Sequence, residues 1–132
     1  MMFTDKVLIA DDEAHIRKFV GLILKRLGAT TIMEASDGEQ TIEMYKAESP
    51  QLLLLDVNMP KLDGLEVLQQ VMAFDPHAIV VMLTSVANRQ TVEECARLGA
   101  TDFIRKDMPR DELSAALQRI IDEAGSTEES TS

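Results

Sequence analysis

Three acidic residues follow two apolar stretches of the sequence. Asp11 and Asp12 come directly after Lys6–Ala10, and Asp56 ends the leucine run Leu52–Leu55. Carboxylates that share one cleft repel each other at neutral pH, so they need a proton or a cation between them. A small hard divalent ion with oxygen ligands, Mg²⁺ above all, suits such a set. These residues predict a magnesium site, provided that the fold brings the two stretches together.

Two hydrogen-bond donors follow two further apolar stretches. Thr84 comes after Ala78–Leu83, and Lys106 comes after Thr101–Arg105. A phosphoryl group on Asp56 would suit a site with such donors, because phosphoryl transfer requires an in-line nucleophile with cations and donors around the phosphoryl oxygens. The residues therefore predict that Asp56 is a nucleophile that forms an acyl phosphate.

Five short apolar stretches have the length of strands, and each is followed by a segment with helical periodicity. Short connections between parallel strands must cross over through helices, so the carboxyl ends of all five strands are expected at one edge. The pattern predicts an α/β fold, with a doubly wound five-stranded parallel sheet and five helices. The strands are expected at Lys6–Asp11, Thr31–Ala35, Leu52–Asp56, Ala78–Leu83 and Thr101–Arg105.

A few residues indicate where helices begin and end. Gly28 and Gly99 stand where helices are expected to stop, and Gly28 suits a left-handed cap. Ser36 and Glu39 have the spacing of a capping box. The last helix is the clearest, with apolar residues at helical spacing from Leu113 to Ala124.

Length and composition restrict the class of protein. The chain of 132 residues has room for one domain, expected over residues 1–124, and the acidic Ser/Thr-rich tail 125–132 is expected to be disordered. A net charge of −10, from 23 acidic and 13 basic residues, argues against direct binding to nucleic acid or to an anionic membrane. A single cysteine, no signal peptide and no apolar segment of membrane-spanning length favour a cytoplasmic location.

The order of these motifs resembles that of a known family. The sequence carries Asp11-Asp12, Asp56 followed by Asn-Met-Pro, then Asp63-Gly64, Thr84-Ser85, Gly99-Ala100 and Lys106. With these motifs the chain resembles the receiver domain of two-component response regulators, and its size is close to that of the stand-alone chemotaxis type. The resemblance spans about Val7 to Ala124, and it implies the flavodoxin-like strand order 2-1-3-4-5.

The resemblance also implies roles for individual residues. Asp12, Asp56 and the backbone carbonyl of Asn58 would bind Mg²⁺, with Asp11 acting through water. Asp56 would accept a phosphoryl group from a histidine kinase or a histidine phosphotransfer protein. Thr84, Lys106 and Phe103 would bind the phosphoryl group and switch the surface formed by the fourth helix, fifth strand and fifth helix. Asn58 and Val86 hold the positions that tune the phosphate lifetime.

The switched surface would bind a downstream protein whose identity the sequence does not give, and a phosphorylation-dependent homodimer is compatible with it. The family usually has proline after its lysine, whereas this chain has Asp107. A non-proline cis bond costs about 2.5–4 kcal/mol, so a trans Lys106–Asp107 peptide is expected.

Three other interpretations compete with this one. Taken alone, Asp11, Asp12 and Glu13 could simply cap the helix that follows them. A phosphohydrolase of the haloacid dehalogenase type also forms an aspartyl phosphate, but it needs an acid two residues after the nucleophile, where this chain has Asn58. A receiver that is never phosphorylated and only binds proteins is disfavoured, because all five residues of the expected site are present. We therefore expect a signalling protein and not an enzyme.

Overall fold

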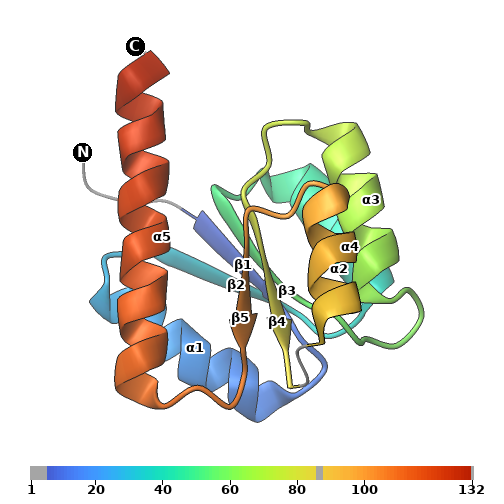
Figure 1. The fold of residues 1–132 in the computed structure, drawn as a ribbon, viewed down its shortest axis with the longest axis horizontal. Coiled ribbons are helices and arrows are strands. Elements are labelled where there is room, and N and C mark those ends of the chain that lie inside the picture. Colours follow the sequence, from blue (N-terminus) through green and yellow to red (C-terminus); the bar gives the residue numbers. More distant parts are fainter. Residues whose placement is uncertain (1–5, 86–87, 132) are drawn as a thin grey trace.

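Five parallel strands alternate with five helices in the part of the chain that the structure describes (Figure 1). The computed structural model describes residues 6–85 and 88–131, with side chains described as far as residue 123. Val86, the second of the residues expected to tune the phosphate lifetime, lies outside the described residues. The strands are β1 (Lys6–Ala10), β2 (Thr31–Ala35), β3 (Leu52–Asp56), β4 (Val80–Thr84) and β5 (Asp102–Arg105). The helices are α1 (Ala14–Arg26), α2 (Gly38–Glu48), α3 (Gly64–Phe74), α4 (Arg89–Arg97) and α5 (Arg110–Thr131).

The sheet has the strand order β2-β1-β3-β4-β5, and every neighbouring pair is parallel. The predicted fold class and strand order are therefore confirmed. In the register of the sheet, Ala10 lies opposite Leu55 and Asp56 lies opposite Leu83. Strands β1, β3 and β4 consequently end at almost the same level, which places the residues that follow them at one edge.

Helices cover both faces of the sheet. In Figure 1, α1 and α5 lie on one side and α2, α3 and α4 on the other. The leucine run of β3 is completely enclosed between these layers: Leu52 and Leu54 pack in the core cluster that includes α1 and α5, and Leu53 and Leu55 pack in the cluster that includes α2 and α3. Alternate side chains of a strand point to opposite faces, so a run of four leucines suits a strand that is buried on both sides.

Two of the predicted helix ends are confirmed and one predicted cap is wrong. Gly28 and Gly99 follow α1 and α4 with φ angles of 111° and 107°, the left-handed conformation in which glycine has no steric penalty. The residue that caps α2 is Asp37 and not Ser36, because the Asp37 side chain accepts a hydrogen bond of 2.8 Å from the Gln40 N–H.

Helix α5 continues to Thr131, beyond residue 124 where the sequence indicated that the helix ends. Extension of an existing helix adds one backbone hydrogen bond per residue without a new nucleation step, so weak helix formers can prolong it. The division into a domain over 1–124 and a tail over 125–132 stays a prediction. Within the described part of the chain, no helix has the length and apolar character needed to cross a membrane.

Candidate functional site

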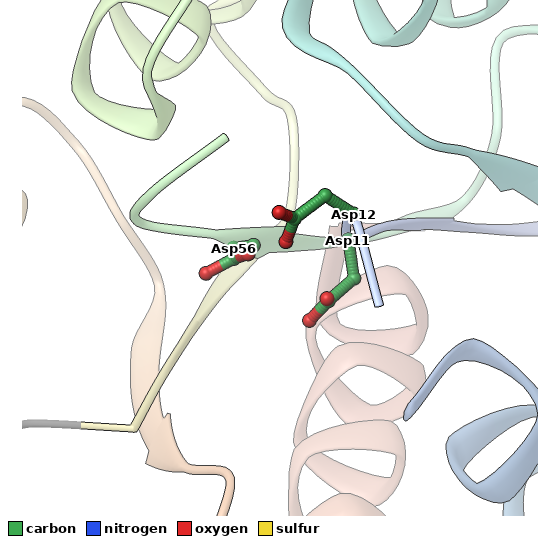
Figure 2. Close-up of side chains that lie close together, drawn as sticks. All are labelled: Asp11, Asp12 and Asp56. Atoms are coloured by element: carbon green, nitrogen blue, oxygen red, sulfur yellow. The ribbon is translucent and has the colours of Figure 1, made fainter. Parts of the chain in front are cut away.

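The predicted acidic residues lie together at the carboxyl edge of the sheet. Asp11 follows β1 directly, and Asp56 is the last residue of β3. One carboxylate oxygen from each of Asp11, Asp12 and Asp56 lies within 4.8 Å of the others. Figure 2 shows the three side chains close together, with Asp11 and Asp12 beside each other and Asp56 next to them. Asp11 and Asp56 are buried, whereas Asp12 is exposed, so the group opens to solvent at Asp12.

Lys106 connects this group to the fifth strand. Its ammonium lies 2.7 Å from Asp11 Oδ2, 3.1 Å from Asp56 Oδ2 and 2.9 Å from Glu13 Oε2, and only 8% of its side chain is exposed. One cation therefore contacts three carboxylates, two of which are buried. This arrangement compensates part of the negative charge that the fold concentrates at this edge.

Backbone hydrogen bonds fix the positions of these residues. The N–H of Asp11 donates to the Ala35 carbonyl at 3.0 Å, and the N–H of Lys106 donates to the Thr84 carbonyl at 2.7 Å. The N–H of Val57 donates to the Leu83 carbonyl at 2.9 Å, directly after Asp56. Each side chain thus leaves the backbone where a strand of the sheet is still held by its neighbour, and such a rigid base suits a site that depends on geometry.

The interpretation of the acidic run as a simple helix cap is not supported. The N-cap of α1 is Glu13, whose side chain makes no capping hydrogen bond. Asp11 Oδ1 instead accepts a hydrogen bond of 2.8 Å from the Glu13 N–H in the turn between β1 and α1. The side chains of Asp11 and Asp56 have the same local arrangement, because Asp56 Oδ1 accepts from the Asn58 N–H at 3.2 Å.

Burial and neighbouring charges change the acidity of the group. Burial, and after it the charge of Asp11, raise the pKa of Asp56 from its ordinary value of 3.8 to about 6, against the opposite effects of Lys106 and the Asn58 N–H. Burial opposes the charged form of Lys106, but the carboxylates of Asp11, Glu13 and Asp56 outweigh it and raise the Lys106 pKa above its ordinary value. The same contact lowers the pKa of Glu13.

The raised pKa of Asp56 can be measured directly. In the metal-free protein, we expect the carboxyl ¹³C resonance of Asp56 to titrate with a midpoint near pH 6. The substitution Asp11→Asn should lower this midpoint, because it removes the charge that disfavours ionisation of Asp56. A midpoint near the ordinary value in the unsubstituted protein would contradict the burial and repulsion described here.

The carboxylates fit a divalent cation. Asp11 Oδ2 is a buried oxygen that lies 2.7 Å from the Lys106 ammonium, and Asp56 and Glu13 share this one ammonium. A buried carboxylate that shares its cation and lies beside two further carboxylates is an arrangement that a hard cation with oxygen ligands can satisfy. The exposed Asp12 leaves room on its side for the waters that Mg²⁺ usually retains.

The other predicted residues lie around this group at different depths. Thr84 is the last residue of β4 and is buried. Phe103 is half-buried on β5, opposite Met82, and packs against the core cluster beneath α4. Asn58 is exposed, two residues beyond β3. The structure therefore places Thr84 at the site edge, whereas the ring of Phe103 belongs to the packing of the sheet against the helices.

Two features were settled only by the structure. No cis peptide bond occurs in the described residues, so the Lys106–Asp107 peptide is trans as expected. The contact of Glu13 with Lys106 was not predicted, although both residues adjoin predicted site residues. They lie 93 positions apart in the sequence, and a third acid after Asp11 and Asp12 was the only sign of it.

Comparison with known proteins agrees with the fold. The chain is 32% identical over 116 residues to the chemotaxis protein CheY of Bacillus subtilis, a match that covers 88% of this chain and 97% of the relative. It is 34% identical over 116 residues to the protein CcdB of the same organism, with the same coverage. Among solved structures, CheY in the CheX–CheY–BeF₃–Mg²⁺ complex of Borrelia burgdorferi superposes with a TM-score of 0.82 at 33% identity, over 92% of this chain and 89% of that one.

A family assignment follows from these matches. The response regulator receiver domain family matches residues 7–118, which include the carboxylate group and Lys106. Receiver domains of this kind are signalling proteins and not enzymes in the usual sense. The chain belongs to the response regulator receiver domain family.

Proposed function

We propose that this receiver domain accepts a phosphoryl group on Asp56 from a histidine kinase or a histidine phosphotransfer protein. The observation that carries the proposal is the position of Asp56, a buried carboxylate at a strand end, 3.1 Å from the Lys106 ammonium and beside two further carboxylates. The Asp56 carboxylate attacks phosphorus, the bond between phosphorus and the donor's histidine nitrogen breaks, and an acyl phosphate forms.

The neighbouring residues have separate tasks in this step. Asp12, Asp56 and the backbone carbonyl of Asn58 would hold Mg²⁺, with Asp11 acting through water. Bound there, Mg²⁺ supplies positive charge beside the phosphoryl oxygens. Lys106 and the hydroxyl of Thr84 donate to the same oxygens, and the ammonium of Lys106 is already within contact distance of Asp56. Mg²⁺ binding requires Asp56 in its ionised form, although burial favours the protonated form of this side chain.

The response is proposed to pass from Thr84 to the surface formed by α4, β5 and α5. Thr84 lies in register with Arg105, two residues after Phe103 on the neighbouring strand. Phe103 is half-buried and packs against the core cluster on the α2 and α3 side of the sheet. Movement of Thr84 toward the phosphoryl group would let the ring turn inward and change this surface, which is a two-state switch biased by new charge-assisted contacts.

This surface is proposed to bind a downstream protein, or a second copy of the phosphorylated chain. Asn58 and Val86 are proposed to tune the phosphate lifetime. The net charge of −10 favours protein partners over nucleic acid or membrane, and a cytoplasmic location agrees with them.

The central test is incubation with acetyl phosphate and Mg²⁺, followed by measurement of the intact mass. We expect one additional phosphoryl group on the unsubstituted protein and none on Asp56→Asn, because asparagine cannot form the acyl phosphate. The matched control is Asp63→Asn, which replaces an exposed acid of the same loop that caps α3 and accepts from the Glu66 N–H. This control should keep the adduct.

Two results would contradict the proposal. Absence of an adduct with every phosphodonor would favour a receiver that acts only by protein binding. Release of inorganic phosphate from a general phosphomonoester over many turnovers would instead indicate a phosphohydrolase.

A further inference from the structure

We infer that Gly38, the first residue of α2, is a positioning residue for the metal-binding loop that follows Asp56. This inference rests on the metal site of the proposed function. The loop, residues 57–63, connects β3 to α3 and carries Asn58. Gly38 lies outside it, 18 positions before Asp56 in the sequence, and is buried against it.

The reason for glycine at this position is space. A Cβ built on Gly38 would lie 2.3 Å from the Leu62 carbonyl oxygen and 2.6 Å from the Leu62 Cβ, both shorter than side chains tolerate. Among the described glycines, Gly28 and Gly99 have positive φ angles, and Gly38 does not. Because the backbone conformation does not require glycine, the contact with Leu62 does.

Several other contacts fasten the start of α2 to the loop at the same point. The N–H groups of Gly38 and Leu62 both donate to the Pro60 carbonyl, at 3.3 Å and 2.9 Å. Lys61 has a φ of 71°, and its ammonium lies 3.7 Å from the helix cap Asp37. The side chain of Leu62 packs against the core cluster on the α2 and α3 side of the sheet. The middle of the loop is thus seated on the first turn of α2.

The two ends of the loop cannot absorb a displacement. The N–H of Val57 is bonded to the Leu83 carbonyl, and the N–H of Gly64 donates to the Val57 carbonyl at 2.8 Å. A Cβ on Gly64 would lie 2.2 Å from the Asp56 carbonyl oxygen, so this end is in close backbone contact with the strand. A push on Leu62 is therefore expected to move the residues between these fixed points, which include Asn58.

The test is the affinity for Mg²⁺ of Gly38→Ala, measured by isothermal titration calorimetry under conditions in which circular dichroism shows the variant to be folded. Residues that orient metal ligands typically change metal affinity by about 10–100-fold when substituted, and we expect a loss of at least about tenfold. The matched control is Gly21→Ala, another buried helical glycine, whose Cβ would meet only Ile32 and Ile9 side chains at 3.5 and 3.7 Å. This control should bind Mg²⁺ as the unsubstituted protein does.

A second variant keeps the test decisive if Gly38→Ala does not fold. Leu62→Ala retains the backbone but removes the side chain that seats the loop, and it should also weaken Mg²⁺ binding. Unchanged affinity in folded Gly38→Ala would overturn the inference, because the first turn of α2 would then yield in place of the loop. Unchanged affinity in folded Leu62→Ala would overturn it as well, because the contact between α2 and the loop would then not position the metal ligands. If the unsubstituted protein itself binds no Mg²⁺, it is the proposed metal site that fails.

Discussion

Replacing Lys106 with methionine is expected to lower the free energy of unfolding of the metal-free domain by about 3–5 kcal/mol at neutral pH, the usual cost of removing one partner from a buried ion pair. The Lys106 side chain is 8% exposed and contacts Asp11 and Asp56, both of which are buried. Methionine keeps most of the aliphatic length but leaves two buried carboxylates without their cation. Urea unfolding in the presence of a chelator measures the difference.

The control for this substitution is Lys6→Met. Lys6 pairs with Glu48 at 3.0 Å, but both side chains are about 40% exposed or more. Exposed ion pairs contribute about 0–1 kcal/mol, so the loss in the control should stay within this range. Equal losses in the two variants would contradict the description of Lys106 as the buried counter-ion of the site.

Combining Lys106→Met with Asp56→Asn distinguishes the loss of the Lys106–carboxylate attraction from the repulsion between Asp11 and Asp56. In Lys106→Met, the repulsion between Asp11 and Asp56 is no longer compensated, and adding Asp56→Asn removes it. We therefore expect Asp56→Asn to stabilise Lys106→Met by more than it stabilises the unsubstituted protein. If Asp56→Asn changes the free energy of unfolding equally in both backgrounds, Asp56 and Lys106 do not interact in the way that their 3.1 Å separation indicates.

Most of the fold could be predicted because local patterns and global packing agree. The four leucines before Asp56 require burial on both faces, and a parallel sheet between two helical layers provides it. The predicted boundaries of the strands were less accurate. Strand β4 begins at Val80 and not at Ala78, because pairing begins where Val80 meets Leu53 and the Ala78 N–H donates to the Asp75 carbonyl in a turn. Such pairing depends on another strand, which a local pattern cannot show.

The candidate site, like the fold, could be predicted only in part. Asp11, Asp56, Thr84 and Lys106 could be grouped from sequence because each adjoins or ends a strand, and parallel strands bring these ends to one edge. The contact of Glu13 with Lys106 and the fit of Gly38 against Leu62 depend on distances of a few ångströms between remote segments. The choice between Ser36 and Asp37 as helix cap is similar, because both side chains can accept the bond and only the backbone path selects one.

The substitution Asp56→Asn is expected to stabilise the metal-free domain by about 3 kcal/mol at neutral pH, although it abolishes the proposed phosphorylation. The pKa of Asp56 is raised from 3.8 to about 6, and a shift of this size corresponds to about 3 kcal/mol of penalty on the ionised form. Asparagine has nearly the same shape and cannot ionise. A residue that lowers stability where it stands is typical of a site retained for function.

The stability gained by Asp56→Asn is expected to depend on pH. The folded protein holds the Asp56 proton up to about pH 6, whereas the unfolded chain releases it near 3.8, so the stability contributed by this group falls as the pH rises between these values. The advantage of Asp56→Asn should be small below about pH 4 and complete above about pH 6. Urea unfolding of both proteins across this range, in the presence of a chelator, measures it.

Mg²⁺ should reduce the stability advantage of Asp56→Asn over the unsubstituted protein. A cation that binds only the folded protein stabilises it by mass action, and this gain should be larger for the unsubstituted protein than for Asp56→Asn, which lacks one of the carboxylates. Addition of Mg²⁺ should therefore narrow the difference between the two proteins at neutral pH. An advantage of Asp56→Asn that is the same at pH 4 and pH 7 would indicate a packing effect, because packing does not titrate, and would exclude the buried charge of Asp56 as its cause.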